Sequence, residues 1–192
     1  MKYRLLLTAA AALSLAACTN DRADDAGADT AAADGAMAEQ ADAAADASAD
    51  GAMANTAQGF VNQAAMSDMY EIEAGKMAQA NGKSQAVKDF GAMLVTDHTK
   101  ASGELKAAAK SAPGVTAPAM LDAKKQADLD ALESAGDGFD ATFKSQQIAA
   151  HTAALALLRS YAEGGDNDAL KAFAAKTAPA IEMHLAAARK LP

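Results

Sequence analysis

Cysteine is nearly absent from this 192-residue sequence, which contains one cysteine, four prolines and no tryptophan. A single cysteine excludes an internal disulfide, so no covalent cross-link can hold the fold together. Long apolar runs are absent too, since none reaches the about 20 residues that a membrane-spanning helix needs. We therefore expect a fold that holds together without a disulfide and that has no membrane-spanning segment.

A basic surface is also missing. The chain has 17 basic and 25 acidic residues, for a net charge of −8. Residues 58–192 are nearly balanced, with 14 basic and 16 acidic side chains. Nucleic-acid-binding domains carry clustered lysine and arginine, so we expect no nucleic-acid partner.

The N-terminus has the parts of an export signal. Two basic residues precede an apolar run over residues 5–15, and residues 15–18 read Leu-Ala-Ala-Cys. This order is typical of a signal peptide, and the last four residues resemble the lipobox of bacterial lipoproteins. We predict a signal peptide over residues 1–17, with Cys18 lipidated and anchoring the chain to a membrane. The alternative is an ordinary signal peptide that is cut nearby.

The segment after Cys18 differs from the rest of the chain. Thr19 stands where, in the enterobacterial sorting pattern that this sequence resembles, Asp retains a lipoprotein at the inner membrane. We therefore predict a periplasmic protein anchored to the outer membrane. Residues 19–57 hold nine acids, one base and mostly Ala, Gly and Ser. Such a composition cannot bury enough apolar surface to offset its ordering entropy, so we predict a disordered acidic tether over residues 18–57.

The remaining residues, 58–192, are rich in helix formers and show no alternating strand pattern. Their apolar periodicity predicts four long helices and one short helix, with Ser84 capping the second and Pro179 kinking the last. Two helical hairpins joined by a long connection form the plan of a ferritin-like bundle. We therefore predict an all-α, ferritin-like four-helix bundle with a short crossover helix. The expected helices span 58–80, 84–110, 121–134, 140–163 and 168–190.

Each long helix places one candidate ligand on its apolar stripe. These residues are Glu71, His98, His151 and His184. Counting from the turns at about 1.5 Å per residue puts all four in the middle third of the bundle, spread over about 12 Å. That spread is too wide for a mononuclear metal site without adjustment.

Two interpretations of these four residues remain open. They could form a structural layer of mutually hydrogen-bonded side chains, which is the commoner fate of buried histidines. They could instead hold a transition metal ion. The paired Glu-x-x-His motifs of di-iron bundles are missing, because Val95 and Ile181 stand where the glutamates belong. No catalytic motif or phosphate-binding loop is present, which favours a non-enzymatic protein.

Two stretches of the sequence carry a family resemblance. Residues 71–78 read Glu-Ile-Glu-Ala-Gly-Lys-Met-Ala, and residues 87–100 contain Asp97-His98-Thr99. Together with His151 and His184, they resemble the bacterial domain of unknown function 4142 over residues 58–191. The resemblance implies a ferritin-like helical fold in an exported, often lipidated protein, and it implies no activity. Our leading hypothesis is an envelope binding or stress-related module, and the rival is a metal-binding or redox bundle.

Overall fold

The computed structural model describes residues 54–192, and within them it contains helices and no strand. The predicted signal peptide, Cys18 and the tether as far as residue 53 lie outside the described residues. A short 3₁₀ turn, Gly136–Gly138, precedes the fourth of the five helices. The helices are α2 (Ala57–Asn81), α3 (Gln85–Ala109), α4 (Ala123–Glu133), α5 (Phe139–Gly164) and α6 (Asp168–Ala188).

Four of these helices begin at a side chain that accepts a hydrogen bond from the exposed end of the backbone. The hydroxyl of Ser84 accepts from the backbone N–H of Val87, as the sequence predicted. Thr56, Asp122 and Asn167 do the same for α2, α4 and α6. Each cap satisfies a backbone donor that has no partner within its helix, which is why the helices start where they do.

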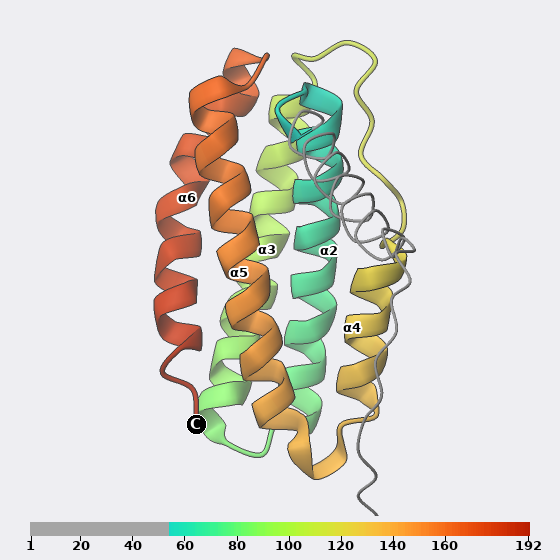
Figure 1. Cartoon of the computed structure of the whole chain (residues 1–192), viewed down its shortest axis with the longest axis vertical. Helices are drawn as coiled ribbons and strands as arrows, with labels where there is room; N and C mark the ends of the chain where they lie inside the picture. The colour runs from blue at the N-terminus through green and yellow to red at the C-terminus, as the bar shows by residue number, and fades with distance from the viewer. Residues whose placement is uncertain (1–53) are drawn as a thin grey trace, which may run out of the picture. The chain divides into compact units, whose positions relative to one another are not determined.

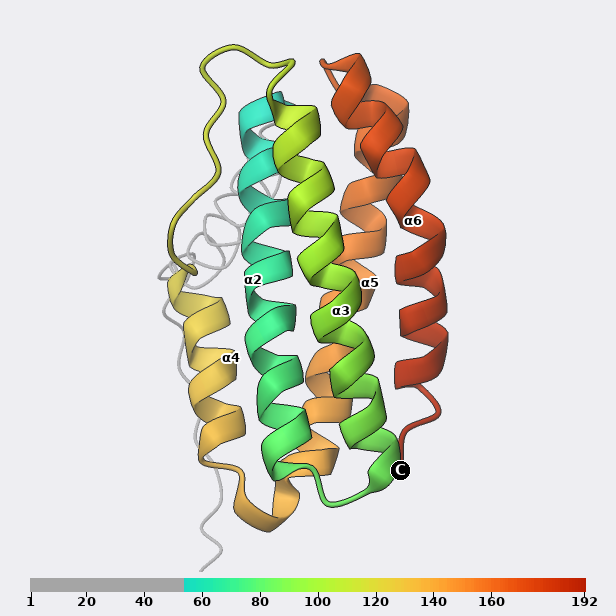
Figure 2. The same ribbon diagram turned by 180° about the vertical axis from the view of Figure 1, so that it is seen from behind.

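The long helices form two antiparallel hairpins that pack against each other. The views from front and back show α2 paired with α3 and α5 paired with α6 (Figures 1 and 2). The α2–α3 turn and the α5–α6 turn lie at opposite ends of the bundle (Figure 1). As a result α3 and α5 point the same way, and a long connection must return the chain between them.

That connection runs along the outside of the bundle and ends in α4. The side chain of Gln58 holds it at Thr116, donating to the Thr116 carbonyl at 2.8 Å and accepting from its N–H at 3.1 Å. Helix α4 then packs against α2 and α5 (Figure 1). The predicted short helix therefore forms the second half of the connection and lies beside the bundle.

The two helices of the first hairpin approach closely at two glycines. A Cβ atom added at Gly75 would lie 2.7 Å from the carbonyl oxygen of Gly91, and one added at Gly91 would lie 2.6 Å from that of Gly75. Such distances are shorter than real Cβ contacts, so only glycine fits at this crossing. The crossing fixes α3 against α2 in the part of the hairpin nearest its turn.

A polar layer separates two clusters of apolar side chains in the core. The first cluster includes Phe60, Tyr161 and Phe173, near the end where the α5–α6 turn lies. The second includes Phe90, Leu94 and Phe143, toward the other end. Between them lie six buried polar residues: Asp68, Glu71, His98, Gln147, His151 and His184. The core is therefore interrupted at mid-height by side chains that need polar partners.

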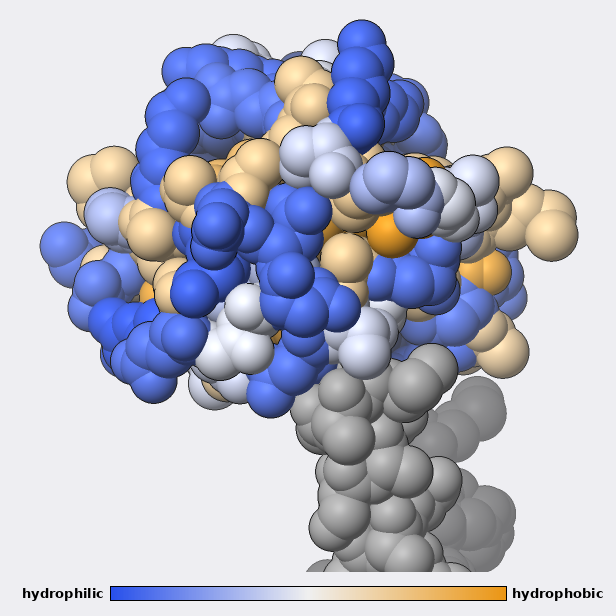
Figure 3. Space-filling model, turned by 90° about the horizontal axis from the view of Figure 1, so that it is seen from above, coloured by the Kyte–Doolittle hydropathy of each residue, from blue (hydrophilic) through white to orange (hydrophobic). Residues whose placement is uncertain are grey.

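One end of the bundle presents a mostly hydrophilic face. Viewed from the end with the α5–α6 turn, hydrophilic side chains cover most of the surface (Figure 3). Among residues 54–192, no helix combines the length and the apolar character needed to cross a membrane. At the N-terminal edge of the described chain, Asn55 accepts a hydrogen bond from Ser160 at 3.1 Å, and Thr56 caps α2. The bundle thus begins slightly before residue 58.

Candidate metal centre

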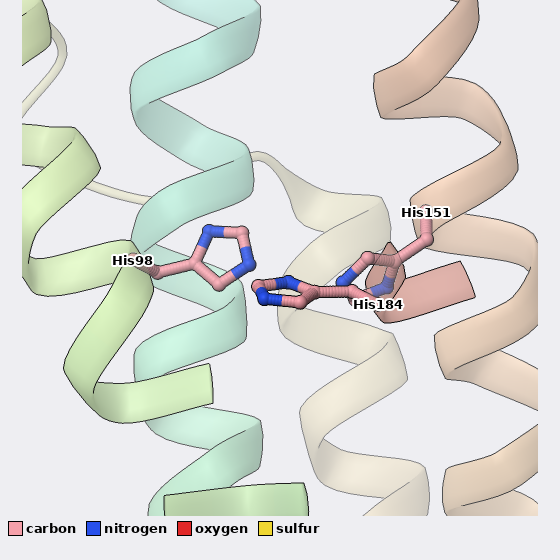
Figure 4. A group of neighbouring side chains, drawn as sticks. All are labelled: His98, His151 and His184. Atoms are coloured by element: carbon pink, nitrogen blue, oxygen red, sulfur yellow. The ribbon is translucent and has the colours of Figure 1, made fainter. Parts of the chain in front are cut away.

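Three histidines from three helices meet in the middle of the bundle. His98 on α3, His151 on α5 and His184 on α6 each expose 3% or less of their surface. Their ring centroids are 5.4 to 5.8 Å apart, and the rings point toward one another (Figure 4). One nitrogen from each ring lies within 4.8 Å of the other two. Three potential ligands therefore converge on one small volume.

Each ring is held by one nitrogen that bonds to an oxygen acceptor. His98 Nδ1 lies 2.8 Å from Asp68 Oδ1, and His184 Nε2 lies 2.9 Å from Asp97 Oδ2. His151 Nδ1 lies 2.9 Å from the backbone oxygen of Gln147, one turn earlier on the same helix. A carbonyl or an ionised carboxylate can only accept, so these partners assign the proton to the bonded nitrogen.

The second nitrogen of each ring has no hydrogen-bond partner among residues 54–192. These atoms are His98 Nε2, His151 Nε2 and His184 Nδ1, and all three are buried. In the tautomers set by the outer partners, each of them carries a lone pair. Leaving a buried polar atom unpaired costs about 1–3 kcal/mol. A cation that accepts these lone pairs would remove that cost.

Burial keeps two of the three imidazoles neutral. Desolvation, together with the nearby charge of His98, lowers the pKa of His151 to about 3. Desolvation also lowers the pKa of His184, although Asp97 opposes it. For His98, burial is outweighed by its bond to Asp68 and by the charge of Glu71, so its pKa is raised. In the metal-free protein, His98 is therefore the ring that takes up a proton most readily.

Glu71 lies beside this cluster but outside it. The residue is 1% exposed, and its Oε1 lies 3.8 Å from His151 Nδ1. Its Oε2 has no hydrogen-bond partner in the part of the chain that the structure describes. Burial raises the pKa of Glu71 to about 7, against the lowering effect of His98. The group of side chains close enough to share an ion contains the three histidines without Glu71. Glu71 is thus a buried carboxyl that reaches an ion only by moving its side chain.

The three rings suit a transition metal ion. Around zinc, with Zn–N distances of about 2.0–2.1 Å, tetrahedral ligand nitrogens are about 3.4 Å apart. Closing the present separation takes about an ångström of side-chain movement. Metal-bound histidines usually donate their other ring nitrogen to a carboxylate or a carbonyl, which fixes the tautomer and orients the ring. Asp68, Asp97 and the Gln147 carbonyl occupy these positions.

An aromatic side chain lies against two of the histidine rings. Phe90 lies against two of the rings, with centroid distances of 6.2 Å to His151 and 6.5 Å to His184. Apolar walls exclude water and strengthen electrostatic interactions within the site.

The structure brings three of the four predicted ligands together, and it corrects their estimated separation along the bundle axis. The estimated spread of about 12 Å was wrong, because the three ring nitrogens lie within 4.8 Å. Counting residues from a turn ignores how the hairpins pack against each other and how far side chains reach along the bundle axis.

Two orienting carboxylates were missed by the sequence analysis. Asp97 precedes His98 on α3, yet it bonds His184 on α6. Asp68 on α2 is buried and lies 2.8 Å from His98. The spacing of Asp68 and Glu71 by three residues was the available signal, since it puts two acids on one helix face.

A family model matches residues 41–191, which is most of the chain, and its description is "Domain of unknown function (DUF4142)". The chain belongs to this family. Neither a curated protein nor a solved structure matches it. Membership in DUF4142 confirms the resemblance drawn from residues 71–100 and the later histidines, and it leaves the biochemical role to be argued from the site.

Proposed function

We propose that this DUF4142 domain binds one first-row transition metal ion through His98, His151 and His184. Two observations carry the proposal: one nitrogen of each of the three buried rings lies within 4.8 Å of the other two, and each ring has one nitrogen without a hydrogen-bond partner among the described residues. Imidazole nitrogens suit zinc, copper, iron and nickel ions, and site geometry then decides among these metals. The domain is a non-enzymatic holder of a metal ion, and Glu71 is close enough to become a fourth ligand after a side-chain movement.

A purely structural polar layer explains the same residues less well. In such a layer the buried polar atoms bond to one another, because an unpaired one destabilises the fold. Here one nitrogen of each ring is paired with an oxygen, whereas the other has no partner within the described part of the chain. This division matches a ligand set with its orienting partners.

The arrangement of the hairpins supports a ferritin-like plan for the bundle. Ferritin-like di-iron proteins build their sites from side chains of facing helices at mid-bundle. The proposed site here occupies a comparable position but uses three histidines and is mononuclear.

We further propose that the bundle is held in the periplasm by a lipid on Cys18, at the outer membrane. The Leu-Ala-Ala-Cys sequence at residues 15–18 and Thr19 support this placement. Metabolic labelling with a fatty-acid analogue tests it, with Cys18→Ser as the control. The wild-type chain should incorporate the label and the variant should not. An unlabelled wild-type chain would refute lipidation.

Metal analysis of protein purified without chelators tests the central proposal directly. We expect about one bound ion per chain, or a rise in melting temperature when zinc, copper, iron or nickel is added to the metal-free protein. A ligand that binds only the folded state stabilises it by about 2.7 kcal/mol at a hundred times its Kd. If none of these metals binds or shifts the melting temperature, the proposal is wrong.

An exposed orienting residue separates a metal site from a structural layer. The side chain of Asp97 is 46% exposed, so Asp97→Asn should scarcely change the stability of the metal-free fold. Loss of an orienting carboxylate typically weakens metal binding about 10- to 100-fold. Asp89→Asn, at another exposed acid of α3, is the matched control and should leave affinity unchanged. Equal metal affinities in the two variants would contradict the assigned role of Asp97.

A further inference from the structure

The chain enters α2 through a tight turn that follows a helical residue. Ala54, the first residue that the structure describes, is helical, and the chain turns at Asn55 and Thr56 before α2 begins at Ala57. One residue cannot form a helical turn by itself, since each helical hydrogen bond joins residues four apart. Ala54 therefore points to a helix that arrives from the preceding residues, and a two-residue connection is typical of a helical hairpin.

This turn lies at the edge of the bundle where α2 meets α5, because Asn55 accepts a hydrogen bond from Ser160 on α5 at 3.1 Å. A surface groove of about 420 Å³ lies farther along the same two helices, and α4 forms its third side. Helix α2 contributes side chains between Gln63 and Tyr70 to the lining. Helix α5 contributes mainly small ones, among them Ala149, Ala150, Ala153 and Ala154. A helix that folds back from the turn along α2 and α5 therefore meets a groove with a small-residue floor.

The length of the preceding segment suits this groove. The family model begins at residue 41, so the family's domain includes residues that precede α2. A helix over residues 41–54 is about 21 Å long, at about 1.5 Å per residue. Along α2, the distance from Ala57 to Tyr70 is about 20 Å by the same measure. Such a helix, running back along α2, reaches from the turn to the Tyr70 end of the groove.

The sequence of residues 41–54 gives a helix with one acidic face and one uncharged face. Asp42, Asp46 and Asp50 follow one another at intervals of four, which places them on one side. The other side carries only Ala, Ser and Gly, at positions 41, 44, 47, 48, 51 and 52. Alanine has the highest helix propensity and loses no side-chain entropy on burial. A short alanine-rich helix can therefore pack on a preformed surface, although it cannot build a core of its own.

Two lysines of α4 stand at the rim of the groove. Lys124 pairs with Asp128 at 2.7 Å, yet 82% of its side chain is exposed, and Lys125 Nζ lies 5.5 Å from the centre of the Tyr70 ring. The two acids at the rim already have partners, because Asp122 caps α4 and Asp128 binds Lys124. The lysines are thus the groups that an incoming acidic face meets, and such rim charges set orientation more than affinity.

We propose that residues 41–54 form a helix that folds back along α2 and packs its uncharged face into the groove, with its acids toward α4. The chain's own segment is favoured over a second copy, because the turn at Asn55 holds it beside the groove at a high effective concentration. The predicted tether is then shorter than composition alone indicates. Residues 19–40 remain as a spacer, with an r.m.s. reach of about 26 Å as a random coil.

Paramagnetic NMR tests this placement on the full chain carrying Cys18→Ser, in which each nitroxide attaches at a single cysteine. A nitroxide on Lys124→Cys lies at the rim of the groove. The matched control is a nitroxide on Lys176→Cys, at an exposed position of α6 on the opposite side of the bundle from α4 (Figures 1 and 2). The first nitroxide should broaden the amide signals of residues 41–50 far more than those of residues 25–35, and the second should broaden neither.

Two outcomes of this experiment would overturn the proposal. One is equal broadening of residues 41–50 and 25–35 by the nitroxide at position 124. The other comes from a mixture of isotope-labelled chains without nitroxide and unlabelled chains with it. Broadening of residues 41–50 in that mixture means that the segment docks on a second copy instead of on its own bundle.

Stability measurements on the full chain test the packing without a nitroxide. Ala47→Pro breaks a helix over residues 41–54 and should lower the melting temperature by roughly 5 °C, whereas Ala32→Pro in the spacer should not. Ala153→Glu puts a bulky acid into the groove and should lower it similarly. Its matched control is Ala156→Glu, at another exposed alanine of α5 that does not line the groove.

The double variant of Ala47→Pro and Ala153→Glu decides whether the two changes remove the same contact. If they do, the double variant should melt close to either single variant, because the second change has nothing left to displace. Fully additive effects, or no effect of Ala47→Pro, would overturn the proposal. Neither measurement involves a metal ion, so the result is independent of the proposed metal site.

Discussion

Replacing Glu71 with glutamine should stabilise the metal-free bundle at alkaline pH. Glu71 is 1% exposed, and burial raises its pKa from 4.5 to about 7. A carboxyl with a raised pKa binds its proton more tightly in the folded state than in the unfolded state. The folded protein therefore loses stability as pH rises from about 4.5, and the loss is complete above about 7. Glu71→Gln keeps the shape of the side chain and removes the charge.

The magnitude follows from the pKa difference. Each pKa unit corresponds to about 1.4 kcal/mol, so at pH 8 the variant should be more stable than the parent by about 3 kcal/mol. At pH 5 the difference should fall below about 1 kcal/mol, and at pH 4 it should vanish. For a domain of this size the difference at pH 8 corresponds to a melting temperature roughly 10 °C higher.

Chemical denaturation of both proteins between pH 4 and 8, with metal removed, measures this difference. The comparison must be between variant and parent, because His151 also changes the parent's stability with pH. Its lowered pKa makes the free energy of unfolding rise with pH below 6.5, which is opposite in sign to the effect of Glu71. Glu73→Gln is the control, since Glu73 is exposed on the same helix. If the stability difference between Glu71→Gln and the parent is no larger at pH 8 than at pH 5, the reasoning is refuted. If Glu71 becomes a ligand, saturating zinc should reduce the difference in stability between Glu71→Gln and the parent.

Two further predictions concern the scaffold. Gly75→Ala should destabilise the fold by about 1–3 kcal/mol, because its Cβ would lie 2.7 Å from a backbone oxygen of α3. Gly103→Ala, where the added Cβ meets nothing within 4 Å, should stabilise by about 0.5–1 kcal/mol, and thermal denaturation compares the two. Asp140 accepts backbone hydrogen bonds from Lys83 and Ser84, which outweigh its partial burial and lower its pKa. Asp140→Asn should therefore cost about 1 kcal/mol at pH 7 and progressively less as pH falls below 3.8, and a pH-independent cost would contradict this.

Local patterns were enough to predict the helices and their candidate ligands. Apolar spacing of three and four residues, glycine stops and the cap at Ser84 placed each helix to within about two residues, because these signals act within one turn of the chain. The same spacing placed Glu71, His98, His151 and His184 on inward faces, and all four are buried. The charge and composition of residues 18–57 predict a tether, which lies almost wholly outside the described residues.

The partnerships between helices could be decided only by the tertiary structure. Asp97 orients His184 across 87 positions of sequence, and Asp68 orients His98 across 30. The periodicity of a single helix cannot predict such a pair, because the pair depends on how different helices pack against each other. The Gly75–Gly91 crossing brings α2 and α3 close together, and packing of α5 and α6 against them brings the ring nitrogens within 4.8 Å. The sequence determined which side chains face the core. Helix packing determined which of their atoms meet, because the relative position of two helices depends on contacts between segments that are far apart in the sequence.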